Sequence, residues 1–262
     1  MTGRIENKRI LVTGAGSGMG RAIALRLAAE GARLTLFDLN EAATNTVANE
    51  ILGAGGEAIV VAGNVTERTD VAAAVKAGVD AYGGIDVLFA IAGIIKPMHF
   101  LDVTEENWRT TLDINGLGSL ICQQETAKAM IAQGTGGKLI LTSSIAGRQG
   151  YPNFVPYSAS KFAVTALVQA AARGLAEHGI TCNAFAPGVV DTPLWKKLDL
   201  DLMELGDSKA PGEAFSEFSS GILAGRPGTA DDVTGTALYL ASEDSDYMTG
   251  QIVMIDGGMV LV

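Results

Sequence analysis

Short, unbroken runs of apolar residues recur along the chain and alternate with longer stretches in which apolar residues follow a helical period. Runs of this length without polar interruptions are typical of strands that are covered on both faces of a sheet. Seven segments have this character: Ile10–Val12, Leu34–Phe37, Ala58–Val61, Val87–Ala90, Leu139–Leu141, Cys182–Phe185 and Ile252–Ile255. The intervening stretches that predict helices are Gly20–Glu30, Glu41–Leu52, Thr69–Tyr82, Glu105–Gln133, Tyr157–His178 and Ala230–Ala241.

This alternation predicts parallel βαβ crossovers and hence an α/β fold. We expect one doubly wound parallel sheet of seven strands with helices on both of its faces. No linker, repeat or low-complexity segment interrupts the pattern, so residues 1–262 are predicted to form a single domain.

One connection is much longer than the others. Residues 191–228 separate a strand from the next helix, where about 2–6 residues are usual. Within this segment we expect short helices at Leu198–Leu205 and Phe215–Leu223. A long excursion after the carboxyl end of a strand is where α/β sheets bind ligands, so we interpret it as a substrate-binding lid. A surface insertion without function is the alternative.

Composition and charge exclude several classes of protein. Hydrophobic residues make up 48% of the chain and charged residues 18%, which excludes disorder. The net charge of −10 has the wrong sign for binding a nucleic-acid backbone. Two cysteines and two histidines are too few for a structural zinc site, so we expect no metal. The amino-terminal residues lack the apolar core of a signal peptide, and no apolar run is long enough to span a bilayer, so we expect a cytoplasmic protein without a membrane partner.

Glycines cluster between the first predicted strand and the first predicted helix, in the segment Thr13–Gly20. Glycines at this place let the backbone turn sharply and approach a diphosphate, which then lies at the positive end of the helix. The pattern predicts a dinucleotide site. A glycine-rich turn that binds nothing is the alternative.

The second predicted strand ends at Asp38. A carboxylate there can accept hydrogen bonds from both ribose hydroxyls of an adenosine, and it would repel a 2′-phosphate. Neither the glycine segment nor Leu39 and Asn40 supply an Arg or Lys for such a phosphate. The charge therefore favours NAD(H) over NADP(H), unless Asp38 merely caps the next helix.

Tyr157 and Lys161 are four residues apart in a predicted helix, so they share one of its faces. Ser143 and Ser144 come shortly before them, at the end of the fifth predicted strand. A phenol with a pKa near 10 is a poor proton acceptor at neutral pH, and a nearby ammonium group favours the phenolate, so we expect the pKa of Tyr157 to be lowered. A serine hydroxyl can hold the substrate oxygen while a hydride passes between carbon and nicotinamide.

Together these residues resemble those of the classical short-chain dehydrogenases/reductases, and the resemblance covers essentially the whole chain. The family's T-G-x-x-x-G-x-G motif matches Thr13–Gly20, and its Y-x-x-x-K motif matches Tyr157–Lys161. Its catalytic serine matches Ser144, and its helix asparagine, which bends the backbone to hold a proton-relay water, matches Asn115. The resemblance implies a Rossmann fold, with Asn115, Ser144, Tyr157 and Lys161 as catalytic residues.

The same resemblance implies where NAD(H) would bind. Pro187 and Gly188 match the family's P-G after the sixth strand, which would bring Val190 and Thr192 to the nicotinamide carboxamide. The implied cofactor contacts are Gly14, Ser17, Gly18, Met19, Gly20, Asp38, Leu39, Asn64, Val65, Ala92, Gly93, Tyr157, Lys161, Pro187, Gly188, Val190 and Thr192.

Two segments depart from the family's pattern. The usual N-N-A-G after the fourth strand is Ala90–Gly93 here, without either amide, so the hydrogen bonds that those amides make in the sheet must come from elsewhere. The usual acid near the adenine is Asn64, which can still bond adenine.

The substrate is less well defined by the sequence. Residues 158–173, 192–195 and 247–260 resemble acetoin reductases and butanediol dehydrogenases, which implies a small hydroxyketone, diketone, diol or polyol as substrate. Diol enzymes commonly have a glutamine after the catalytic serine, whereas this chain has Ile145, which suits a ketone with a hydrocarbon flank. Candidate substrate-binding residues are Ile145, Phe154, Trp195 and Met98, each of which could equally be ordinary core. Acidic side chains of the lid are expected to form a solvated face: Asp199, Asp201, Glu204, Asp207, Glu213 and Glu217.

Other functions are weaker interpretations. A 3-oxoacyl-type or hydroxysteroid-type ketone reductase is an alternative within the same chemistry. A non-catalytic nucleotide-binding scaffold would usually have lost the tyrosine or the lysine, and a serine hydrolase would need a G-x-S-x-G motif that the chain lacks. The apolar tail Met259–Val262 and the long helix predicted over Glu105–Gln133 indicate interfaces, and the resembled family is typically tetrameric, so we expect a homotetramer.

Overall fold

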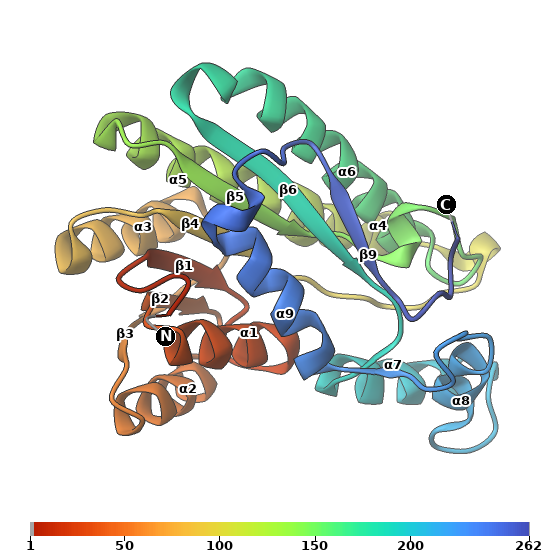
Figure 1. Ribbon diagram of the computed structural model, residues 1–262. Coiled ribbons are helices and arrows are strands. Elements are labelled where there is room, and N and C mark those ends of the chain that lie inside the picture. Colours follow the sequence, from red (N-terminus) through yellow and green to blue (C-terminus); the bar gives the residue numbers. More distant parts are fainter. Residues whose placement is uncertain (1–2, 262) are drawn as a thin grey trace.

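Seven parallel strands lie side by side in one sheet, in the order β3-β2-β1-β4-β5-β6-β9 (Figure 1). The structure is a computed structural model and describes residues 3–261. Each predicted strand lies within one observed strand. The strands are β1 Arg9–Thr13, β2 Arg33–Asp38, β3 Glu57–Ala62, β4 Val87–Ala90, β5 Gly137–Thr142, β6 Ile180–Pro187 and β9 Ile252–Ile255. The predicted Rossmann-type α/β fold is therefore confirmed, and the strand order reverses at β1, between β2 and β4.

Helices cover both faces of this sheet (Figure 1). One face carries α1 (Gly18–Ala29), α2 (Glu41–Gly53) and α9 (Ala230–Ala241), and the other carries α3 (Arg68–Tyr82), α5 (Gly118–Gln133) and α6 (Val155–Gly174). Successive strand residues point to opposite faces, so each strand contributes to two separate cores. In β1, for example, Ile10 and Val12 pack with α1 and α9, whereas Leu11 packs with the α3–α5–α6 layer.

The helix predicted over Glu105–Gln133 is not continuous, and in this respect the prediction was wrong. It consists of α4 (Glu105–Leu112), a π-helical turn η2 (Asp113–Leu117) and α5. Within η2 the Asn115 side chain bonds outside the helix, and the Ser119 hydroxyl donates to the Asn115 carbonyl at 2.6 Å. Polar side chains that compete with the backbone in this way accompany a locally widened turn, which apolar periodicity does not register.

The end of the helix predicted over Tyr157–His178 was also wrong. The α-helix α6 ends at Gly174, and a 3₁₀ turn η4 (Ala176–His178) follows it. Gly179 then takes a φ of 68°, a left-handed conformation that stops the turn before β6. Three further 3₁₀ turns occur in loops: η1 Phe100–Asp102, η3 Ile145–Gly147 and η5 Glu243–Ser245.

The lid segment contains two helices between two short paired strands. The strands are β7 (Val190–Asp191) and β8 (Gly228–Thr229), and the helices are α7 (Pro193–Glu204) and α8 (Glu213–Ser219). The first helix starts five residues earlier than predicted, because Pro193 occupies its first turn, a position that proline favours.

Asp199 corrects the expectation of a solvated acidic face on the lid. It is only 6% exposed. Its carboxylate accepts hydrogen bonds from the backbone N–H groups of Gly212 and Phe215, at 2.5 and 3.2 Å. The side chain therefore satisfies unpaired donors at the start of α8 and joins α7 to α8.

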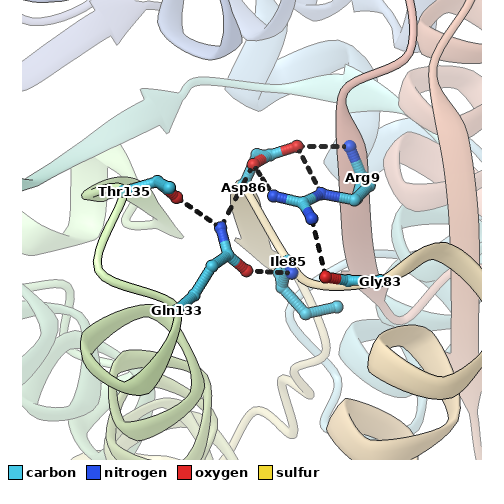
Figure 2. A network of polar contacts seen from close by, with 6 residues as sticks. All are labelled: Arg9, Gly83, Ile85, Asp86, Gln133 and Thr135. Carbon is cyan, nitrogen blue, oxygen red and sulfur yellow. Dashed lines mark hydrogen bonds and ion pairs between the residues drawn. The ribbon is translucent and has the colours of Figure 1, made fainter.

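A polar network ties the elements together at the amino-terminal end of the strands (Figure 2). Asp86 accepts from the backbone N–H and the Nε of Arg9, both at 2.9 Å, and Arg9 also donates to the Gly83 carbonyl. Gln133, at the end of α5, donates to Asp86 and to Thr135. Burial would raise the pKa of Asp86, but the hydrogen bonds and the charge of Arg9 outweigh it and hold the pKa below its usual value.

Asp86→Ala should lower the free energy of unfolding by about 2 kcal/mol, because it leaves Arg9 unpaired in a partly solvated site. The lowered pKa means that this stabilisation is present above the unfolded pKa of about 3.9 and disappears as the pH falls through the folded value. Urea unfolding at pH 7 and pH 3 measures both effects. Asp80→Ala, which removes an exposed ion pair with Lys76 on α3, is the control and should cost less than about 0.5 kcal/mol. Equal costs for the two variants would contradict the assignment.

Candidate active site

Two cavities lie at the carboxyl ends of the strands, and Leu194 of the lid lines both of them. The larger cavity has a volume of about 350 Å³ and the smaller about 60 Å³. The larger lies over the point where the strand order reverses, which is the usual position of a ligand in such sheets.

The larger cavity brings together most of the residues expected at the cofactor. Those that line it are Gly14, Ser17, Gly18, Met19, Gly20, Asp38, Leu39, Asn64, Val65, Ala92, Gly93 and Thr192. Gly188 and Tyr157 line the smaller cavity instead, and Pro187, Val190 and Lys161 line neither. Sequence reasoning missed Phe37, Gly63, Ile91, Ile94, Ile114, Pro193 and Leu194, most of which directly neighbour the expected residues in the chain.

The glycine segment is packed so closely that side chains are excluded from it. A Cβ on Gly20 would lie 2.0 Å from the Gly14 carbonyl oxygen, and Gly14 itself has a φ of 67°. Ser17 precedes α1 without a side-chain hydrogen bond to its first turn. The first N–H groups of α1 are thus left for an anion, and the residues present fit a diphosphate.

Asp38 is fixed by two backbone donors. Its two carboxylate oxygens accept from the N–H groups of Gly16 and Asn40, each at 2.9 Å. The cap of α2 is Asn40, whose side chain accepts from Ala43 N–H at 3.1 Å. Asp38 is therefore not the cap of that helix, and its remaining lone pairs are available to a ligand in the larger cavity.

Two other side chains bond the backbone of the loop after β4, where Ala90–Gly93 lacks both amides. The Thr13 hydroxyl accepts from the N–H groups of Ile91 and Ala92, at 3.0 and 3.2 Å, and so joins the ends of β1 and β4. The Asn115 side chain bonds both backbone groups of Ile94. It accepts from the Ile94 N–H at 2.8 Å and donates to the Ile94 carbonyl at 2.9 Å.

Asn115 also connects this loop to α6. Its amide donates to the Ser160 hydroxyl at 3.0 Å, and Ser160 donates to the Tyr157 carbonyl at 2.7 Å. Asn115 is 1% exposed, so these bonds are sheltered from water. The π turn allows the side chain to reach across while the helix continues beyond it.

Ser144 and Tyr157 meet at the smaller cavity, which both of them line. Ser144 follows β5 and accepts from Ala146 N–H at 3.1 Å, which fixes its side chain. Burial raises the pKa of Tyr157, and a hydrogen bond with Ser144 opposes that rise in part. The lowered pKa that we expected from the sequence is not found in the protein alone, because desolvation of the phenolate outweighs the hydrogen bond.

Lys161 lies beneath Tyr157. Its Nζ is 5.5 Å from the centre of the Tyr157 ring and donates to the Thr142 carbonyl at 2.8 Å. The residue is 5% exposed, and burial lowers the pKa of its amine to about 8. Its nearest hydrogen-bond acceptor is neutral, so the ammonium group is held close to the phenol without a carboxylate to neutralise it.

Aromatic and aliphatic side chains form most of the smaller cavity. Ile145, Phe154 and Trp195 line it as expected, whereas Met98 does not. Sequence reasoning missed Ile95, Ala146, Tyr151, Val189, Leu194, Leu198 and Phe218. Phe218 could have been found from its spacing. It lies three positions after Phe215 in a segment predicted to be helical, so the two rings share one face of that helix.

Polar contacts fasten the lid over this cavity. Asp207, between α7 and α8, accepts from the Asn153 amide at 2.6 Å, and the His99 ring lies 3.3 Å from the Leu205 carbonyl. The backbone carbonyl of Asn153 also accepts from the Met98 N–H at 3.0 Å. The loops after β4 and β5 thus hold the lid from two sides.

Among residues 3–261, no three His, Cys, Asp or Glu side chains gather as a metal site. Within the same range, every helix is too short or too polar to cross a membrane.

Lys161→Met tests the burial of the ammonium group. In the unfolded chain a lysine keeps its proton up to a pKa of about 10.4, whereas here the pKa is about 8. Between these values the unfolded state binds more protons, so raising the pH from 7 to 10 should stabilise the wild type relative to Lys161→Met by about 2–3 kcal/mol. Urea unfolding of both proteins at the two pH values measures the difference. A constant difference would show that the ammonium is not desolvated.

Comparisons with known proteins identify the family of the chain. The family described as enoyl-(acyl carrier protein) reductase matches residues 14–260. L-2,3-butanediol dehydrogenase of Corynebacterium glutamicum is 39% identical, over 97% of this chain and 99% of that protein. The crystal structure of levodione reductase superposes with a TM-score of 0.92 at 32% identity, covering 97% of this chain and 98% of that one. A Beutenbergia cavernae protein solved with bound NADP has a TM-score of 0.88 at 33% identity, covering 99% of both chains. The chain belongs to the short-chain dehydrogenase/reductase family of oxidoreductases.

Proposed function

We propose that this protein transfers a hydride between NAD(H) and a small secondary alcohol or ketone, with Tyr157 as general acid and base. The observation that carries the proposal is the Ser144–Tyr157 hydroxyl pair at a small apolar cavity beside the larger cavity that the glycine segment and Asp38 line. Its similarity to a butanediol dehydrogenase supports a small substrate.

Each polar side chain of the site has a separate role in the proposed reaction. A bound nicotinamide supplies or accepts the hydride and, when oxidised, carries a positive charge. The hydroxyls of Ser144 and Tyr157 hold the substrate oxygen, and the proton at Tyr157 Oη passes to it during ketone reduction. The Lys161 ammonium lies near the phenol ring and favours the phenolate, against the burial that raises the pKa of Tyr157. Asn115 acts on the site by bonding the loop after β4 and the start of α6, at Ile94 and Ser160.

The choice of NAD(H) rests on Asp38. Its carboxylate is oriented by Gly16 and Asn40 and lines the larger cavity. Two ribose hydroxyls can donate to it, whereas a 2′-phosphate would face a fixed negative charge at short range. Of the described residues that line this cavity, none is an Arg or Lys that could compensate that repulsion.

Reduction of simple 2-alkanones tests the proposal. We expect wild-type turnover with NADH, at a kcat/KM at least about tenfold above that with NADPH, and a loss of about 10²-fold or more in Tyr157→Phe. Tyr239→Phe, which removes a hydroxyl on the outer helix α9, is the control and should retain full activity. Equal rates in Tyr157→Phe and the wild type would remove the proposed acid and base.

We also propose that the protein assembles as a homotetramer through two apolar surfaces. The first, called the α5–α6 surface, comprises four side chains that are 39–47% exposed: Trp108 of α4, Leu117 of η2, Ile131 of α5 and Phe162 of α6. The second is the carboxyl-terminal tail, where Leu261 is 79% exposed; Val262 lies outside the described residues. Two different self-complementary surfaces generate a closed tetramer, and large exposed apolar side chains are typical of interfaces.

Sedimentation should give a mass near four times the 27.0 kDa of one chain. Ile131→Asp on the α5–α6 surface should reduce the assembly to dimers, because it buries a charge without a partner. Leu52→Asp, which places the same charge on the exposed side of α2, is the control and should leave the mass unchanged. A wild-type mass of 27 kDa at micromolar concentration would contradict the proposal.

A further inference from the structure

The smaller cavity is built to receive hydrocarbon. Ser144, Tyr157 and Tyr151 contribute hydroxyls and Trp195 an indole N–H, and within the described chain no charged or amide side chain lines it. The first two hydroxyls are those proposed to hold the reacting oxygen, and the Tyr151 hydroxyl already accepts from Gln149 at 2.7 Å. For a second hydroxyl on the substrate the cavity offers only the Trp195 N–H and the hydroxyl proton of Tyr151, and its other lining side chains are apolar. Burying a hydroxyl there is therefore less favourable than burying an alkyl group.

Phe218 is the centre of the aromatic wall. Its ring lies 5.6 Å from Trp195, 5.8 Å from Phe154 and 6.5 Å from Tyr151, centre to centre, in tilted arrangements. Phe218 comes from the lid, whereas Phe154 and Tyr151 come from the loop before α6. One side chain therefore joins the part of the wall that the lid contributes to the part that the loop before α6 contributes.

The wall is held in place before any substrate arrives. Asp199 bonds the first turn of the helix that carries Phe218, and Asp207 bonds Asn153 beside Phe154. The volume left is about 60 Å³. Since about 10–15 Å³ by this measure accommodates one water molecule, it has room for a few non-hydrogen atoms.

We infer that the group on the substrate beyond the reacting carbon is a short hydrocarbon, and that Phe218 limits its length and excludes hydroxylated analogues. The inference rests on the proposed function and narrows it: the substrate class is a short-chain alkyl ketone or secondary alcohol rather than a diol or polyol. Phe218 is a specificity-determining residue, which takes no part in the transfer of the proton.

A series of 2-alkanones measures the length limit. We expect kcat/KM of the wild type with NADH to peak at a chain of about four to six carbons and to fall for longer chains. Phe218→Ala should move the peak to longer chains and raise kcat/KM for 2-octanone by about tenfold or more, because removing the ring enlarges the cavity. Phe218→Leu should give an intermediate peak.

Phe215→Ala is the matched control. Phe215 lies on the same helix, and the centre of its ring is 5.6 Å from that of Trp195, but it does not line the smaller cavity. Its removal should leave the chain-length optimum in place. A melting temperature for each variant separates loss of the fold from a change of the cavity.

A pair of nearly isosteric alcohols measures the exclusion of hydroxyls. 3-Methylbutan-2-ol has a methyl group where 2,3-butanediol has its second hydroxyl. With NAD and the wild type, we expect the KM of the diol to be higher by about 10–100-fold, the extent to which an apolar pocket rejects an added hydroxyl.

The outcomes separate this inference from the proposed function. An equal or lower KM for the diol, or a chain-length optimum that is the same in the wild type, Phe218→Ala and Phe218→Leu, would overturn the inference while leaving hydride transfer intact. Absence of turnover with every alcohol and ketone tested would overturn both.

Discussion

The arrangement of the site depends on the hydrogen bonds of one buried amide, that of Asn115. It bonds both backbone groups of Ile94 and the hydroxyl of Ser160, and Ser160 bonds the Tyr157 carbonyl. The loop after β4 lines the larger cavity and the start of α6 lines the smaller one. A side chain in a regular α-helix would project from a different angle, so the π turn and the alignment of the two cavities are parts of one constraint. Since the amide is sheltered from water, each of its bonds is costly to lose.

Burial of the site also shifts the pKa values of Tyr157 and Lys161. Burial disfavours the charged form of each, so it raises the pKa of the phenol and lowers that of the amine to about 8. The protein alone therefore holds a protonated phenol and a lysine that loses its proton more readily than in water. A ligand that brings positive charge into the site favours the phenolate of Tyr157. The protonation of Tyr157 therefore depends on what the site binds.

Most of the fold could be predicted from the sequence, because buried parallel strands produce unbroken apolar runs with few alternatives. The interruption at Asn115 could not, since one inserted residue leaves the apolar period on either side intact. Asp199 was misjudged for a related reason: a carboxylate in an acidic segment looks solvated until the start of another helix is seen to donate to it. In the candidate site, the residues of the glycine segment and Asp38 were identifiable from their order along the chain. Phe218 was not, although Phe154 and Trp195 were expected at the substrate, because these three rings come together only when the lid folds back over the loop before α6.

The position of the Arg9–Asp86 network has a consequence for how this architecture can vary. It joins β1, β4 and α5 at the amino-terminal ends of the strands (Figure 2). Both cavities lie at the opposite, carboxyl ends. The network that stabilises the sheet and the residues that select the substrate therefore lie in separate regions. Substitutions at the cavities need not lower the stability that the network contributes. The lid can therefore be redesigned for a different compound without changing a residue of the Arg9–Asp86 network.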